Sequence, residues 1–152
     1  MKLKKVLTIL LTSVMLLTVS SSVFAADVSP TAIGVGDTKE TAITLFAPLQ
    51  EIELFLSNIN DKDWFKWTNN TGEDTYIYAQ MIPRGNQCRF RLGMEVSYAN
   101  GKNSTILYAR EYPLGESQVL AFMIPKGATA YFVVDSTQYA MEGYKFQFRT
   151  DL

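Results

Sequence analysis

Apolar and polar residues alternate along much of this chain, and this alternation constrains the fold more than any other feature. It is clearest from Cys88 to Val96, where every second residue is apolar, as on one face of a β-strand. Asn100-Gly101 follows, a dipeptide typical of tight hairpins. Turn residues recur at roughly 8–12-residue intervals, which predicts an all-β, antiparallel sandwich or barrel of about eight short strands.

The expected strands follow directly from this pattern. The segment 118–124 is nearly continuous in apolar residues and predicts a strand buried on both faces. The segment 38–45 is the one place in the sequence that could hold a short helix. The predicted strands are 50–57, 64–68, 75–81, 88–98, 104–110, 118–124, 129–135 and 144–149.

The N-terminal segment has the order of a secretory signal peptide. Lys2, Lys4 and Lys5 precede an apolar run, and small residues then lead to Val23-Phe24-Ala25. The alternative, a membrane anchor, fits less well because the run is shorter than the ~20 apolar residues that span a bilayer. We therefore expect a signal peptide at 1–25, an extended lead-in at 26–37, a single domain at 38–152, and a secreted, extracellular protein.

The charge of the mature chain argues against two classes of binding partner. Removal of the signal peptide would take three of the 14 basic residues and leave a net charge of −4. No run of Lys or Arg remains to bind phosphates, so neither a nucleic acid nor a membrane surface is expected as a partner.

Catalytic signals are absent from the sequence. The chain has no histidine, which removes the commonest general base and the usual Ser and Cys triads. Glu51 and Glu53 form a carboxylate pair, but they alternate with apolar residues and are expected on a solvated strand face. Cys88 is the single cysteine, so an intrachain disulfide is impossible, and its place in the alternation predicts a buried core residue. The sequence thus predicts a protein that is not an enzyme.

Two groups of polar residues could bind a ligand. The cluster from Asn58 to Asp63 offers the oxygen ligands that Ca²⁺ requires, but the same Asn and Asp side chains could simply build a turn. Both interpretations stay open. Tyr76 and Tyr78 point away from Ile77 and Ala79, as either ordinary sheet residues or part of a binding surface.

Several segments resemble, in order, the bacterial pre-peptidase C-terminal domain family. The resemblance covers about residues 35–149, and its motifs are Asp37 to Leu45, Asn60 to Trp67, the turn from Asn69 to Thr75, Pro125-Lys126-Gly127 with the strand after it, and Gly143 to Phe146. The resemblance implies a jelly-roll-like β-sandwich. Members of this family are usually non-catalytic appendages of secreted proteases, and they include collagen-binding domains of clostridial collagenases.

The family resemblance also implies candidate site residues. Asp37, Asn60 and Asp63 match calcium ligands, with Asp61 nearby, whereas Val35 and Gly36 replace the acidic residues expected before Asp37. Tyr108 matches one collagen-contacting tyrosine, so it is a candidate ligand-binding residue. The other two such positions are Asp135 and Thr137 here, which argues against the same ligand.

These observations favour a secreted, non-catalytic accessory or binding protein that resembles a free-standing domain of this family. It is expected to be a monomer, with calcium as the candidate metal and an extracellular protein or polymer as its partner. The alternatives are a secreted protease inhibitor, an antimicrobial or cell-wall-associated interaction protein, and a cryptic hydrolase.

Overall fold

The computed structural model describes residues 36–110 and 112–151, and this part of the chain contains strands and no helix. The predicted signal peptide and most of the predicted lead-in lie outside the described residues. Within them, no helix is long and apolar enough to cross a membrane. The strands are β1 (Ile43–Thr44), β2 (Leu49–Phe55), β3 (Asp63–Thr68), β4 (Thr75–Pro83), β5 (Arg89–Ser97), β6 (Leu107–Tyr108), β7 (Gln118–Ile124), β8 (Thr129–Gln138) and β9 (Gly143–Thr150).

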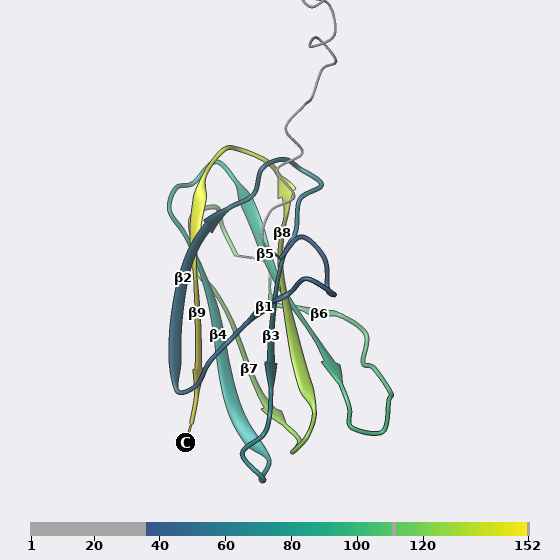
Figure 1. Cartoon of the computed structure of the whole chain (residues 1–152). Coiled ribbons are helices and arrows are strands. Elements are labelled where there is room, and N and C mark those ends of the chain that lie inside the picture. The colour runs from purple at the N-terminus through teal and green to yellow at the C-terminus, as the bar shows by residue number, and fades with distance from the viewer. Residues whose placement is uncertain (1–35, 111, 152) are drawn as a thin grey trace, which may run out of the picture. The chain divides into compact units, whose positions relative to one another are not determined.

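The strands form two sheets that pack face to face (Figure 1). One sheet has five strands in the order β1-β3-β8-β5-β6, and the other has four in the order β2-β9-β4-β7. The pairs are antiparallel except for β1, which pairs with β3 in parallel through Ile43 and Thr44. The predicted all-β sandwich is therefore confirmed, with nine strands in the described part of the chain.

Aromatic side chains from both sheets fill the space between them. Phe146 of β9 stacks on Phe65 of β3, with 4.1 Å between ring centroids and 5° between ring planes. Phe132 of β8 makes tilted contacts with both Phe146 and Phe148. Cys88 is only 1 % exposed, so its predicted place in the core is confirmed. Burial of this apolar surface is the main stabilising contribution to the fold.

Three sequence predictions need correction. The segment 38–45 is not helical, because the Thr38 and Thr41 side chains bond each other and the backbone in a turn that leads into β1. The strand expected at 104–110 has only two residues, in β6. The bounds of β7 match the prediction. However, β7 is an edge strand of its sheet, and one of its two faces is exposed to solvent. Val119 is 48 % and Met123 is 50 % exposed there.

The outer faces of the two sheets differ. On the five-stranded sheet, Trp64 and Val133 are buried under Ala42 of the turn that precedes β1. The Lys39 ammonium of the same turn bonds the Glu95 carboxylate at 2.5 Å. The outer face of the four-stranded sheet instead leaves large apolar side chains exposed: Leu49, Phe55, Tyr76, Val119 and Met123. An exposed group of this kind is a candidate interaction surface.

Candidate functional site

The first candidate site is a group of three carboxylates at one end of the sandwich. Asp63 opens β3 on its inner face, and Asp61 lies in the loop before it. The Trp64 N–H donates to the Gly36 carbonyl at 2.7 Å, which fixes the neighbouring Asp37 beside them. Carboxylate oxygens of these three aspartates all lie within 4.8 Å of one another.

Glycine at position 36 is required for this arrangement. Its φ is +98°, a conformation that L side chains rarely adopt, and an added Cβ would lie 2.9 Å from the Trp64 carbonyl oxygen. This glycine thus allows the chain to approach β3 closely.

The loop before β3 is built by its own polar side chains. Asp61 accepts the Ser57 N–H at 2.6 Å and the Lys62 N–H at 2.8 Å, and Asn58 accepts the Asn60 N–H at 2.8 Å. The interpretation of this cluster as a turn is therefore confirmed. Asn60 itself is exposed. Binding of a metal ion by Asn60 and the three aspartates stays a prediction.

Among the described Asp and Glu residues, Asp63 is the one whose pKa is clearly shifted. It is 4 % exposed, and its carboxylate accepts the Tyr144 O–H at 2.5 Å. The pKa of Asp63 is raised from 3.8 to about 7, chiefly by burial; the hydrogen bond from Tyr144 lowers it in part, and the charges of Asp61 and Asp37 add to the rise. A proton or a cation would relieve this repulsion between carboxylates.

The geometry of the cluster fits a hard cation. Oxygen ligands of Ca²⁺ lie at about 2.3–2.6 Å from the ion, so two ligands of one ion are at most about 5 Å apart. The 4.8 Å limit that the three carboxylates satisfy falls within that span. Asp37, Asp61 and Asp63 could therefore share one ion, with backbone carbonyls or water as further ligands.

Tyr108, the predicted ligand residue, is engaged within the protein. Its O–H donates to Asp135 at 2.9 Å, and the Arg91 guanidinium lies 4.4 Å from its ring centroid. Arg91 also holds Asp135 by two bonds of 2.8 and 2.7 Å. Burial, followed by the hydrogen bond to Asp135, raises the pKa of Tyr108.

The place of Tyr108 is set by Gly93, opposite it on β5. A Cβ at Gly93 would lie 3.0 Å from the Tyr108 ring. The ring thus covers the glycine and closes this part of the five-stranded sheet. This geometry gives Tyr108 a packing role, and its contact with a ligand stays a prediction.

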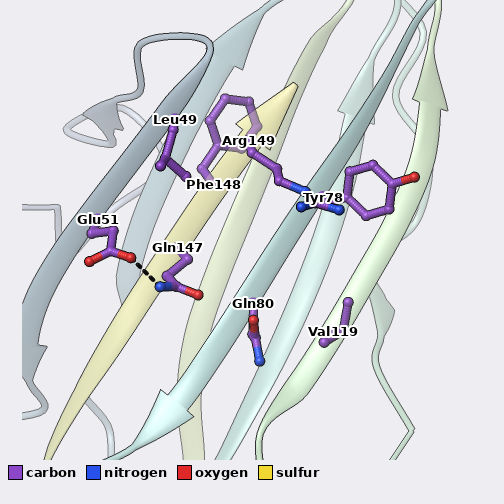
Figure 2. Close-up of a pocket in the computed structure, with 8 residues that line it drawn as sticks. All are labelled: Leu49, Glu51, Tyr78, Gln80, Val119, Gln147, Phe148 and Arg149. Carbon is purple, nitrogen blue, oxygen red and sulfur yellow. Dashed lines mark hydrogen bonds between the residues drawn. The ribbon is translucent and has the colours of Figure 1, made fainter. Parts of the chain in front are cut away.

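The second candidate site is an open groove of about 340 Å³ on the exposed face of the four-stranded sheet (Figure 2). Its volume lies at the small end of the range for ligand sites, about 300–1,000 Å³. Side chains from all four strands line it: Leu49 and Glu51 from β2, Gln147 and Arg149 from β9, Tyr78 and Gln80 from β4, and Val119 from β7.

Three polar side chains of the groove, Glu51, Gln147 and Arg149, are held in place by their neighbours. Figure 2 shows the Gln147 amide turned toward Glu51, to which it donates a hydrogen bond. The Lys145 ammonium lies 3.6 Å from the other Glu51 oxygen. The Arg149 guanidinium lies over the Tyr78 ring, 4.3 Å from its centroid.

The amino-acid sequence alone does not predict the groove. The alternation placed Glu51 and Tyr78 on outward faces correctly, but it could not show that their strands share a sheet. The order β2-β9-β4-β7 joins strands that are distant in sequence, and only that order brings these residues together. The available signal was the pair Tyr76 and Tyr78, both outward and both aromatic.

A second groove lies at the other end of β2 on the same sheet. It measures about 390 Å³ and is lined in part by Glu53, Phe55, Arg84 and Met141. Arg84 forms an ion pair with Glu53. Glu51 of the first groove and Glu53 of the second are two residues apart, so both grooves open along one strand.

Comparison with known proteins finds similar structures but assigns no family and no function. No protein-family model matches the chain, and no curated protein matches it. Among solved structures, it is similar to a mitogen from Yersinia pseudotuberculosis, with 7 % identity over 66 % of this chain and 84 % of that chain, and a TM-score of 0.49. It is also similar to the pre-peptidase C-terminal domain of a collagenase from Bacillus anthracis, with 12 % identity over 72 % and 94 % of the two chains, and a TM-score of 0.45.

A third similar structure is TmCBM61 in complex with β-1,4-galactotriose, with 10 % identity, coverage of 78 % and 99 %, and a TM-score of 0.40. At these identities and TM-scores, the similarities concern the path of the backbone alone.

Proposed function

We propose that this chain is a secreted, non-catalytic binding protein that uses the exposed face of its four-stranded sheet. The open groove on that face carries the proposal, because among residues 36–110 and 112–151 a turn covers part of the opposite outer face, whereas this face keeps large apolar side chains exposed. Its partner is an extracellular polymer or protein.

The residues of the groove support binding and give no support to catalysis. Hydrolysis of a glycosidic bond commonly needs two carboxylates, one on either side of the reacting bond. Among the described residues, Glu51 is the one carboxylate that lines this groove. The chain has no histidine to act as a general base. Burial raises the pKa of the Cys88 thiol, which makes it a poor nucleophile.

Secretion is part of the proposal and rests on the N-terminal sequence. Export with cleavage after Ala25 gives a mature chain that begins at Ala26. Intact-mass measurement of protein from the culture medium tests this, and retention of Met1 to Ala25 would contradict it.

We also propose that Asp37, Asp61 and Asp63 bind Ca²⁺, which is abundant outside cells. The proximity of the three carboxylates and the burial of Asp63 support this role. The bound ion would connect the segment at Asp37 to the start of β3 and so stabilise the sandwich.

The binding function is tested by capture. Immobilised mature protein is incubated with isolated cell walls, with collagen and with culture supernatant, and bound material is identified after washing. We expect one fraction to be retained, and retention to fall when Gln80 and Gln147 are both changed to Ala. Equal retention by this double variant and the parent, or none by the parent, would refute the proposal.

A further inference from the structure

We propose that the groove over β2, β9, β4 and β7 binds a neutral, hydroxyl-rich glycan chain. This inference rests on the proposed binding function and names its ligand class. The hydrogen-bonding groups, the apolar surfaces, the charge balance and the backbone pairing of the sheet each support it.

The hydrogen-bonding groups form one row across three strands. Glu51 pairs in register with Gln147, and Gln147 pairs with Gln80, so the three side chains project side by side from the same face. Carboxylate and amide groups are planar and present two polar atoms each, and the amides offer both donors and acceptors. Adjacent sugar hydroxyls, which also donate and accept, can bond both atoms of one such group.

Apolar surface stands next to this polar row. Tyr78 lies on the neighbouring row of the sheet, and the Arg149 guanidinium over its ring limits its motion. Leu49 and Val119 stand on opposite sides of the groove (Figure 2). A sugar ring has hydroxyl groups at its edge and C–H groups on its faces, so it matches a site that sets apolar side chains beside amides. Holding the polar groups in place before binding lowers the entropy cost of association.

The charge of the groove favours an uncharged ligand. Its lining has one acidic side chain, Glu51, and one basic side chain, Arg149, and each already has an oppositely charged or aromatic neighbour. An acidic polymer would need clustered positive charge that this lining does not have. The balance therefore matches a neutral glycan.

The backbone pairing of the sheet argues against an extended peptide in this groove. β9 pairs with β2 on one side and β4 on the other, and β4 pairs with β9 and β7. Peptides that add to a sheet bind mainly through free backbone groups at an edge strand. The groove spans the outer face of all four strands, and its middle lies over β9 and β4, whose backbone groups are paired on both sides.

The second groove along β2 indicates a ligand longer than one sugar ring. Phe55 is 62 % exposed and Met141 is 80 % exposed at that end of the sheet. Tyr76, on β4 two residues before Tyr78, adds an aromatic ring that is 51 % exposed on the same face. A chain of sugars could contact these side chains beyond the first groove.

Affinity electrophoresis of the mature protein tests the proposal. Native gels contain glucan, galactan, xylan or mannan, with polygalacturonate as an anionic comparison and gelatin as a protein comparison. We expect at least one neutral polysaccharide to slow the parent protein. The same polymer should bind Gln147→Ala, Gln80→Ala and Tyr78→Ala at least tenfold more weakly, while thermal melts confirm that these variants fold.

Matched controls are Gln87→Ala and Tyr98→Ala, which change exposed residues outside the groove and should bind as the parent does. Unchanged binding by the three groove variants would overturn the proposal, and so would binding of gelatin or polygalacturonate alone. Failure of every neutral polysaccharide to bind would also overturn it. The capture experiment identifies retained material of any class. A protein partner found there would support the proposed binding function and contradict the glycan as its ligand.

Discussion

Asp63 is a buried carboxyl group whose protonation state affects the stability of this fold. Its pKa is about 7 in the folded protein against an ordinary value of 3.8, so the folded state binds a proton more readily than the unfolded chain between these values. Its stabilising contribution is complete below about pH 3.8 and is lost as the pH rises through about 7. The difference corresponds to roughly 4 kcal/mol of unfolding free energy.

We therefore expect the unfolding free energy of the parent, measured with urea in EDTA, to decrease from pH 4 to pH 8 relative to Asp63→Asn. The amide keeps a hydrogen-bonding partner for Tyr144 without a charge to bury, so the variant should be the more stable protein at pH 8. Parallel pH profiles for the two proteins would show that Asp63 titrates normally.

Calcium should replace the proton at the same cluster. At a concentration ten times its dissociation constant, Ca²⁺ should stabilise the parent by about 1.4 kcal/mol. With three carboxylates we expect a dissociation constant on the order of 10⁻⁴–10⁻³ M, and weaker binding below pH 7, where Asp63 is protonated. Thermal melts with and without Ca²⁺ measure the shift.

The Asp63→Asn variant should show no calcium shift, whereas Asp74→Asn, which changes an exposed aspartate outside the cluster, should keep it. Absence of a shift in the parent would contradict a calcium site. Equal shifts in the parent and Asp63→Asn would place the ion elsewhere.

At the scale of elements, Gln118 connects the two sheets. This buried residue of β7 accepts the Leu92 N–H at 2.8 Å and donates to the Phe90 carbonyl at 2.7 Å, both on β5. Gln118→Met keeps the volume but leaves two buried backbone groups unpaired, and we expect a loss of about 2–4 kcal/mol. Urea unfolding measures this, with the exposed Gln87→Met as the control. A loss under about 0.5 kcal/mol would mean that water replaces the amide.

The edge strand β7 lacks charged residues, which favours aggregation of the protein during refolding. It has no charged residue, whereas the opposite edge strand, β2, carries Glu51 and Glu53. Charges on edge strands prevent pairing between molecules. We expect Met123→Lys, at an exposed position, to reduce light scattering during refolding and leave the melting temperature nearly unchanged. Equal scattering by both proteins would show that β7 does not mediate aggregation.

At the scale of the whole molecule, one core joins both sheets, so we expect a single unfolding transition. Both tryptophans, Trp64 and Trp67, lie on β3 of the five-stranded sheet. Their fluorescence and the far-ultraviolet circular dichroism of the whole protein should therefore change together in urea. Two separated transitions would show that the sheets unfold independently.

The sequence predicted the positions of the strands better than their places in the sheets and their exposure to solvent. Alternation is a local property, and it located β5 and β7 well, but the exposure of β7 depends on its place at a sheet edge. The short β1 depends on its pairing with β3, so local preferences pointed to a helix instead. Asp61 and Asp63 were recognised from a cluster in sequence and Asp37 from the family motif, whereas the groove needed the order of four strands.

The single cysteine makes it possible to measure how often the core of this protein opens. Cys88 is covered by the core, and no second thiol exists to compete for a reagent. A thiol reagent can reach it only when the surrounding core opens, so the rate of modification reports how often that opening occurs. Changes in that rate with calcium, with pH or with a bound polysaccharide would then measure, at one atom, how strongly each of them holds the sandwich closed.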